Sequence, residues 1–261
     1  MTKTRQPTSP PYVLLGNGTV ALRFLKAMQA RKYLPELVVL NTRAKQRSGD
    51  LLRAYCRHAG IPISAWSPRV RQRLLSLLRR REGTWLLSVY FGHIIDREVL
   101  HTARGRAVNL HPSLLPWCRG VHTNVWPIVD QTPAGVTLHV MEGQVDAGAV
   151  LAQAEVAVQS WDTGASLYAR LEDGAARLLS RCWPRIVAAR WPGVPQSSGG
   201  TTHRVRDFQT LDRYDLNKHP EARRFFDLLR ARSFPPHQGL LVRLRGDVVE
   251  ATLSLRKVHH A

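Results

Sequence analysis

The chain has 261 residues, of which 44% are hydrophobic, enough for a folded core of one or two domains. No apolar run reaches the roughly 18 residues of a membrane span, so we expect no membrane partner. There are 38 Lys and Arg against 19 Asp and Glu, a net charge of +19. Such a charge attracts polyanions: nucleic acid, phosphorylated small molecules or polyglutamylated cofactors.

The basic residues are mostly arginines, scattered from Arg23 to Arg256, with the densest run at 79–81. Scattered arginines are equally typical of an ordinary solvated surface. We therefore expect either that surface or electrostatic steering of a substrate, and regard a nucleic-acid partner as unlikely. The three cysteines are far apart and show no metal-binding spacing. They favour a reducing, cytoplasmic location and no metal site.

The N-terminal half begins with a polar, proline-containing tail at 1–11, which lacks the apolar region of a secretory signal and is expected to be disordered. Apolar strand-like and helix-like segments then alternate, which predicts an α/β fold with a mostly parallel, doubly wound sheet. The predicted strands are 12–16, 37–40, 61–63 and 85–90, and the predicted helices are 19–31, 49–59 and 70–80.

Gly16-Asn17-Gly18 after the first strand resembles part of a dinucleotide-binding fingerprint. The third glycine would fall at Ala21, and no acidic residue ends the second strand, where Asn41 and Thr42 stand. The motif therefore indicates a tight turn between strand and helix rather than nucleotide redox chemistry.

The C-terminal half changes character. Two strands at 135–140 and 149–158 flank the loop 141–148, and a helix is expected at 163–189, kinked or split by Pro184. A helix starting at Pro220 and a hairpin follow in a small appendage. The hairpin strands are expected at 240–244 and 248–255. The expected domains are a tail at 1–11, a catalytic domain at 12–190, a linker at 191–202 and a C-terminal α+β subdomain at 203–261.

Polar side chains gather where a short strand ends, at residues 109–116. Asn109 and His111 are two positions apart, so on an extended backbone they project to the same side. Pro112 and Pro116 stop the strand and open a loop. Open α/β sheets build sites at such carboxyl ends.

Asp146 lies in the glycine-flanked loop 141–148, which is longer than a tight turn needs. With Asn109 and His111 it forms a set: an amide that donates to a developing oxyanion, an imidazole that moves a proton, and a carboxylate that orients the imidazole. None of these is a strong nucleophile. The set therefore fits a reaction in which the substrate supplies the nucleophile, such as an amine attacking an acyl group.

At these motifs the sequence resembles the folate-dependent formyltransferases. That family carries Asn-x-His-Pro-Ser-Leu-Leu-Pro, found here at 109–116, and a later Asp-x-Gly, found here at 146–148. Further matches stand at 119–120, 132–133, 135–139 and Gln153, and the resemblance covers roughly residues 12 to 190.

The resemblance implies a Rossmann-like core that does not bind NAD, with 10-formyltetrahydrofolate as the formyl donor. It implies catalytic roles for Asn109, His111 and Asp146. Residues that would contact the folate lie around the fourth strand end and in the Asp146 loop: Ser88, Tyr90, Phe91, Gly92, Ile94, Val145 and Asp146.

Within the family, the motifs at 115–126, 207–212 and 230–236 are most similar to enzymes that formylate nucleotide-linked amino sugars. This implies an N-formyltransferase acting on a dTDP-amino-dideoxyhexose, and a homodimer. The resemblance and the need for cations near a diphosphate give these substrate-binding candidates: Trp117, Arg119, Asn124, Trp126, Arg204 and Arg206.

Two alternatives stay open. The amine could belong to an aminoacyl-tRNA, a siderophore hydroxylamine or a peptide-bound amino acid, and the +19 charge keeps tRNA under consideration. A protein of another class would be a basic nucleic-acid-binding protein on an inactive formyltransferase scaffold. The intact set of Asn109, His111 and Asp146 argues against it.

Overall fold

A computed structural model describes residues 9–46, 48–189, 192–216, 221–244 and 246–256. Their contacts divide the chain into two compact units. Unit 1 is drawn from Met1–His111, Thr137–Gln153 and Ala175–Gln196, and unit 2 from Pro112–Val136, Ala154–Gly174 and Ser197–Ala261. No described helix is long and apolar enough to cross a membrane.

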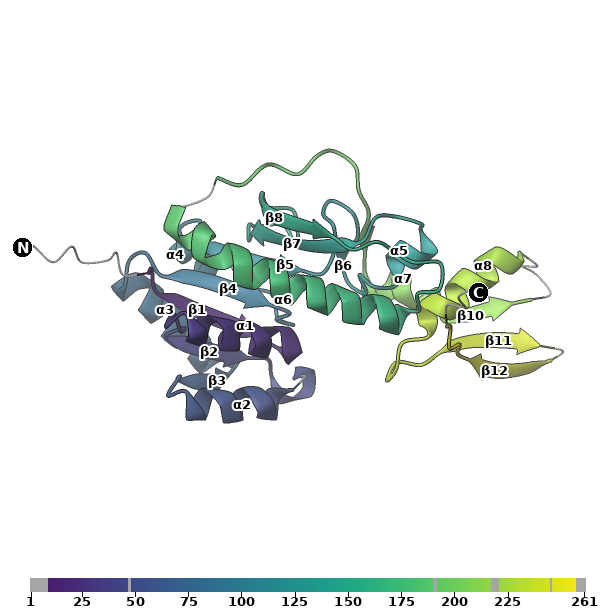
Figure 1. The fold of residues 1–261 in the computed structure, drawn as a ribbon, viewed down its shortest axis with the longest axis horizontal. Coiled ribbons are helices and arrows are strands. Elements are labelled where there is room, and N and C mark those ends of the chain that lie inside the picture. The colour runs from purple at the N-terminus through teal and green to yellow at the C-terminus, as the bar shows by residue number, and fades with distance from the viewer. Residues whose placement is uncertain (1–8, 47, 190–191, 217–220, 245, 257–261) are drawn as a thin grey trace, which may run out of the picture. The chain divides into compact units, whose positions relative to one another are not determined.

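Unit 1 contains most of a seven-stranded sheet in the order β3-β2-β1-β4-β5-β7-β8 (Figure 1). Five strands run parallel, while β7 is antiparallel to β5. β7 begins and β8 ends with residues of unit 2. The strands are β1 (Tyr12–Gly16), β2 (Leu37–Leu40), β3 (Ile63–Ala65), β4 (Trp85–Val89), β5 (Ala107–His111), β7 (Gly135–Val140) and β8 (Val150–Glu155).

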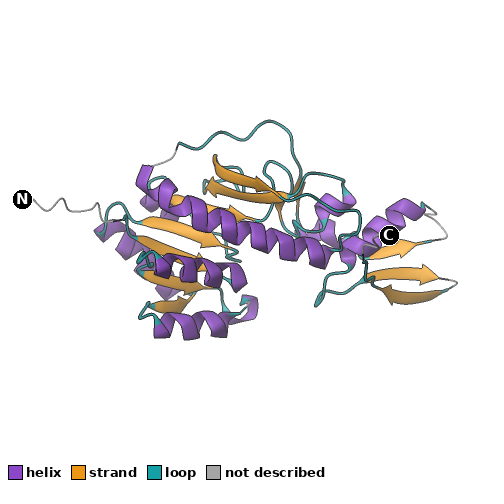
Figure 2. Cartoon of the chain, viewed as in Figure 1, coloured by secondary structure: helices purple, strands orange, loops and turns teal. Residues whose placement is uncertain are grey.

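Every residue of β1, β2 and β4 is buried, as expected for parallel strands covered by helices on both faces. Figure 2 shows these strands alternating with helices along unit 1. α1 packs beside α2, and α3 beside α4. The helices are α1 (Gly18–Ala30), α2 (Gly49–His58), α3 (Pro68–Arg80), α4 (Arg97–Ala103) and the C-terminal part of α6 (Gly164–Ala189), with a 3-10 turn η1 (Arg43–Lys45).

Unit 2 holds the start of α6 and a second, smaller sheet. In that sheet β11 pairs parallel with β10 and antiparallel with β12, and a separate pair joins β6 to β9. The elements are α5 (Trp126–Val129), β6 (Arg119–Gly120), β9 (Thr202–His203), α7 (Val205–Gln209), β10 (Arg213–Asp215), α8 (Ala222–Arg232), β11 (Leu240–Leu244) and β12 (Asp247–Ala251).

The mixed, mostly parallel sheet with a small C-terminal α+β part is confirmed, with local corrections. The third strand was predicted two residues too early, because Ile61 donates its N–H to Cys56 of α2 and so closes that helix. The strand after the Asp146 loop ends at Glu155, and the second hairpin strand ends at Ala251.

Of the two effects predicted for Pro184, a kink or a split, the split does not occur, because α6 continues through this residue. Proline removes one backbone hydrogen bond, but the neighbouring Trp183, Ile186 and Val187 are all buried and hold the helix on the core. The expected tail and the expected helix start at Pro220 fall partly or wholly outside the described residues.

Candidate active site

Three polar side chains lie side by side across the carboxyl ends of β4 and β5 and the neighbouring β7. The register places Ser88 opposite Asn109, and Asn109 opposite His139. His111 is the last residue of β5 and lies opposite Thr137. Strand pairing alone therefore brings these groups together on one edge of unit 1.

Two histidines and a carboxylate converge at this edge. Oδ1 of Asp146 lies 3.5 Å from Nδ1 of His111 and 3.5 Å from Nε2 of His139. Nδ2 of Asn109 lies 3.2 Å from the same Nε2 of His139. His111, His139 and Asp146 are all buried, so their mutual electrostatic interactions are only weakly screened by solvent. The structure thus assembles the three residues expected from the sequence and adds a fourth.

The contacts of His139 determine how the amide of Asn109 is oriented. Nδ1 of His139 lies 2.9 Å from the carbonyl oxygen of Val140, which can only accept, so Nδ1 carries a proton. In a neutral imidazole Nε2 then accepts from the Nδ2 group of Asn109. This leaves the second N–H of Asn109 for another acceptor. His139 was part of a motif quoted from the sequence, but its cross-strand register with Asn109 was not foreseen.

The loop that carries Asp146 is tightly constrained. Asp146 has a φ of 54°, in the left-handed region that non-glycine residues seldom occupy. At Gly148 an added Cβ would lie 2.0 Å from the carbonyl oxygen of Val140, so only glycine fits there. The carboxylate is therefore held at the histidines by an unusual backbone conformation.

The residues expected to contact folate lie at the same edge of unit 1. Ser88 is buried in β4, and Tyr90 follows the strand with a φ of 54°. The residue Ile94 is 82% exposed and Val145, in the Asp146 loop, is 58% exposed.

The loop after β4 is anchored to the end of β2. Gly92 donates its N–H to Oδ1 of Asn41 at 2.9 Å, and Lys45 donates to the Gly92 carbonyl at 3.0 Å. Phe91 and His93 contact the ring of Trp66. Sequence reasoning missed these anchors, because they join loops that follow different strands.

His93 is a further missed residue. Its Nε2 lies 3.2 Å from the backbone N of Thr42, which donates to it. Burial first, and then the positive charge of Lys45, lower the pKa of His93. The neutral form that accepts from Thr42 is thereby favoured.

The substrate-binding residues expected from the sequence all lie in unit 2. Asn124 is buried and donates to the Gly164 carbonyl at 2.9 Å. Trp126 donates its Nε1–H to the Val121 carbonyl at 3.0 Å, and its ring stacks on His203 with centroids 3.8 Å apart. These contacts tie both side chains into the framework of unit 2.

The remaining candidates of this group are more accessible. Trp117 and Arg119 are half-buried. Arg204 precedes α7, and its backbone N donates to Asp207 at 2.7 Å. Nε of Arg206 lies 3.7 Å from Asp207. Arg204 and Arg206 are both exposed.

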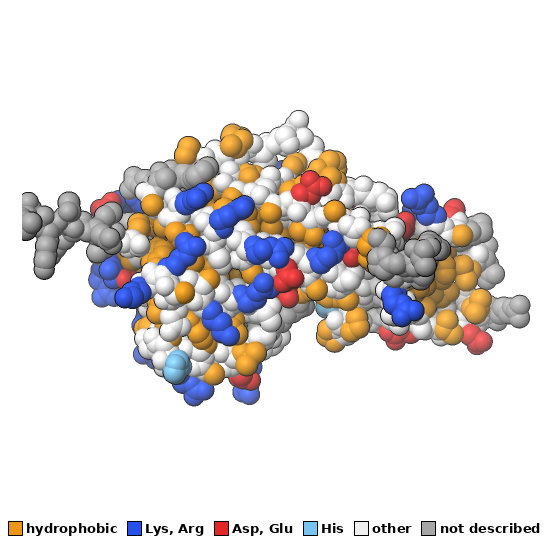
Figure 3. All heavy atoms as spheres, viewed as in Figure 1, with side chains coloured by type: hydrophobic (Ala, Val, Ile, Leu, Met, Phe, Trp, Pro, Cys, Tyr) orange, Lys and Arg blue, Asp and Glu red, His pale blue; other side chains and the backbone are white. Residues whose placement is uncertain are grey.

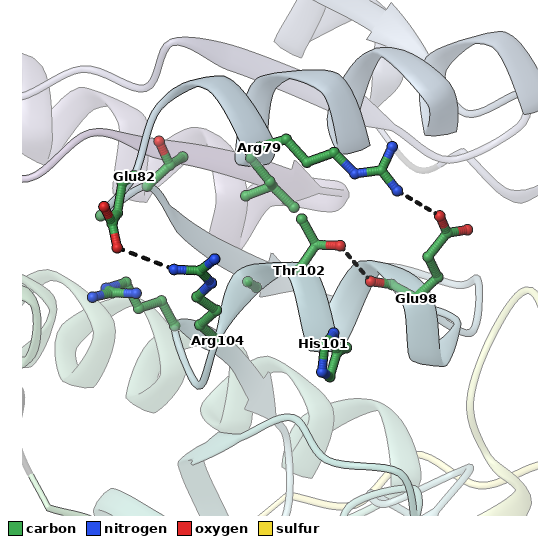
Figure 4. A pocket seen from close by; sticks show the side chains of 11 residues that line it. Arg79, Glu82, Glu98, His101, Thr102 and Arg104 are labelled. Carbon is green, nitrogen blue, oxygen red and sulfur yellow. Dashed lines mark hydrogen bonds and ion pairs between the residues drawn. The ribbon is translucent and has the colours of Figure 1, made fainter.

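A hollow of about 380 Å³ lies at the opposite edge of the sheet in unit 1 (Figure 4). It is lined by Thr84 and Arg106, which precede β4 and β5, so it faces the amino ends of the strands. Much of its charge is neutralised by two ion pairs, Arg79 with Glu98 and Arg104 with Glu82. It is separate from the catalytic set. Among the described residues, no group of three or more His, Cys, Asp or Glu could hold a metal ion.

Comparison with known proteins yields two family matches. The formyl transferase profile matches residues 13–182, and a profile described as the N-formyltransferase dimerization C-terminal domain matches residues 207–256. Over 126 residues the chain is 36% identical to dTDP-4-amino-4,6-dideoxyglucose formyltransferase of Mycobacterium tuberculosis, which covers 48% of this chain and 54% of the relative. The chain thus spans about half the length of the curated relatives it matches.

Solved structures share the fold. A sugar N-formyltransferase from a Shewanella species has a TM-score of 0.81 at 22% identity, over 96% of this chain and 99% of that chain. An N-formyltransferase from Helicobacter canadensis, in complex with folinic acid and dTDP-3-aminofucose, has a TM-score of 0.74 at 19% identity, over 91% and 85%.

Proposed function

We propose, from the premise that this chain belongs to the formyl transferase family, that it transfers a formyl group from 10-formyltetrahydrofolate to the amine of a nucleotide-linked amino sugar. The observation that carries the proposal is the cluster of half-buried Asn109 with buried His111, His139 and Asp146 at the carboxyl edge of the sheet. It offers oxyanion donors and a proton acceptor but no protein nucleophile, so the acceptor amine must attack.

The chemistry follows from the positions of these groups. The uncharged amine attacks the formyl carbon, and a C–N bond forms while the carbonyl oxygen becomes an oxyanion. The free N–H of Asn109 and the imidazole of His111 stabilise that oxyanion. Asp146, directly or through His111, takes the proton that the amine releases. The folate nitrogen then leaves as the formyl C=O is restored, and it takes up the proton that Asp146 or His111 had accepted from the amine.

The folate is proposed to lie against the loop after β4 and the Asp146 loop. Ile94, in the loop after β4, and Val145, next to Asp146, expose apolar side chains, and Asn41 and Lys45 hold the backbone around Gly92. An apolar border around a few fixed polar groups suits a pterin ring. No metal is proposed.

A dTDP-linked acceptor is supported by the named activity of the M. tuberculosis relative and by the sugar of the H. canadensis complex. Cationic groups are needed near a diphosphate, and the exposed Arg204 and Arg206, with Arg119, supply them. The roles of Trp117, Asn124 and Trp126 as direct ligands are part of the same proposal.

The test offers several amines to the purified protein with 10-formyltetrahydrofolate and measures release of tetrahydrofolate. We expect turnover and thermal stabilisation with dTDP-4-amino-4,6-dideoxyglucose. We expect neither with initiator aminoacyl-tRNA, a hydroxylamine or a peptide amine. Turnover confined to tRNA, and competition by short RNA at moderate salt, would replace the proposed acceptor by the rival one.

We also propose a homodimer located in the cytoplasm, with a catalytic domain at 12–190, a linker at 191–202 and a C-terminal subdomain at 203–261. The matched dimerization profile at 207–256 supports the dimer. Figure 3 shows hydrophobic side chains gathered over β11 and β12. The exposed large apolar residues of this subdomain include Phe226, Leu244, Val248 and Val249.

A further inference from the structure

The segment after α6 is packed onto the catalytic sheet in unit 1. Val194 pairs antiparallel with Val150 at the start of β8, and each donates its N–H to the other's carbonyl at 2.8 Å. A Cβ added at Gly193 would lie 2.6 Å from the Cβ of Ala149. Residues 192–196, called the strap below, therefore follow the edge of the sheet next to the Asp146 loop.

The strap reaches the Asp146 loop through one side chain. Nε2 of Gln196 donates to the carbonyl oxygen of Asp146 at 2.8 Å and to that of Gly148 at 2.9 Å. Both partners can only accept, so the amide must face them with its nitrogen. Its two N–H groups thus bridge the residues on either side of Ala147.

This bridge bears on a residue of the site with an unfavourable backbone conformation. Asp146 has a φ of 54°, and a non-glycine residue keeps such a conformation only when its surroundings fix it. The same residue places its carboxylate 3.5 Å from His111 and from His139. Release of the Asp146 carbonyl would let the peptide rotate and carry the carboxylate away from both imidazoles.

We propose that Gln196 is a positioning residue, which holds the Asp146 loop in its left-handed conformation so that the carboxylate stays beside His111. The structural half of this inference is that Gln196 holds the loop, and it does not depend on the proposed function. The catalytic half, that this placement of the carboxylate supports turnover, rests on the proposed function. The strap is therefore a part of the catalytic apparatus rather than a passive connection to the C-terminal subdomain.

The test compares Gln196→Met and Gln196→Glu with the parent enzyme. Methionine keeps the length of the side chain but has no donor. Glutamate keeps the shape of the side chain but places a carboxylate oxygen, which cannot donate, against the carbonyl oxygens of Asp146 and Gly148, which repel it. Gln72→Met is the matched control, because Gln72 is exposed on α3 in the same unit. We expect every variant to melt within about 3 °C of the parent, since only an edge contact is lost.

Amide hydrogen exchange measured by mass spectrometry should show faster exchange over 142–150 in both Gln196 variants and unchanged exchange over β5. In steady-state kinetics kcat should fall about tenfold to a hundredfold, the cost of a small misplacement of a catalytic group. The loss should be larger for Gln196→Glu, with the KM for both substrates within about twofold of the parent. The control should match the parent in both measurements.

Unchanged exchange over 142–150 in both variants would overturn the structural half. Faster exchange with an unaltered kcat would overturn the positioning role. If the parent enzyme formylates none of the offered amines, the proposed function fails on its own. The exchange comparison then still decides whether Gln196 holds the loop.

Discussion

The polar residues of the site differ in which of their groups contact neighbouring residues. Asn109 gives one N–H to His139 and keeps the second. Nδ1 of His111 lies 3.5 Å from Oδ1 of Asp146. Both ring nitrogens of His139 have neighbours in the site: Nδ1 lies near the carbonyl oxygen of Val140, and Nε2 lies near Asn109 and Asp146. These differences predict graded effects of substitution on kcat, which should be largest for the residues proposed to touch the reacting atoms.

Asn109→Ala and His111→Ala should each lower kcat about a hundredfold to a thousandfold, the usual cost of one lost oxyanion donor. Both variants should fold, because alanine is tolerated at a strand end. Asp146→Asn should have a comparable effect while binding of the sugar nucleotide, measured by titration calorimetry, stays as in the parent. Near-normal turnover in Asn109→Ala or His111→Ala would disprove the assignment.

His139→Leu should lower kcat about tenfold to a hundredfold, because the amide of Asn109 would lose its orientation. The KM for the amino sugar should change little, since both ring nitrogens of His139 contact protein groups. His101→Leu serves as the control, as His101 is an exposed residue of α4 in the same unit. Equal kcat values for the two leucine variants would show that Asn109 is oriented by other means.

At the scale of elements, the loop after β4, which we propose borders the folate, is anchored by a histidine that accepts a hydrogen bond in its neutral form. His93 accepts from the backbone N of Thr42, and its pKa is lowered by burial and by Lys45. As the pH falls, His93 is therefore protonated at a higher pH in the unfolded chain than in the folded protein. The stability that neutral His93 contributes is complete above about pH 6.5 and is lost as the pH falls from there through the folded pKa.

The parent should accordingly lose stability more steeply than His93→Gln as the pH is lowered from about 7.5 to 5, the range around the ordinary histidine pKa. Urea unfolding at a series of pH values measures this difference. The variant should be the less pH-dependent of the two, because glutamine does not titrate. Parallel stability curves would show that His93 does not sense pH in the folded protein.

The sequence predicted a helix, a strand or a site residue correctly where the pattern lies within one short segment. The buried runs at β1, β2 and β4 and the spacing of Asn109 and His111 are local patterns, and the strands formed where expected. Contacts that join distant segments were not readable. His139 meets Asn109 only through the antiparallel register of β5 and β7, and Gln196 lies in a Pro-, Gly- and Ser-rich stretch that predicts only a linker.

At the scale of the whole molecule, β12 is an edge strand of the small sheet of unit 2 among the residues that the structure describes. Four residues of β12, including Val248 and Val249, are exposed, so its two faces are both accessible. An apolar edge strand of this kind promotes pairing with another chain. A second copy of this chain is the partner that the dimerization profile supports.

Val249→Asp should therefore shift the protein from dimer to monomer at micromolar concentration, since a buried, unpaired charge is costly in an interface. Leu51→Asp is the control, because Leu51 is an exposed apolar residue of α2 in unit 1. Sedimentation equilibrium of the parent and both variants measures the association. A monomeric parent, or a dimeric Val249→Asp, would place the interface elsewhere. If a folded, monomeric variant loses turnover, the active site depends on the dimer.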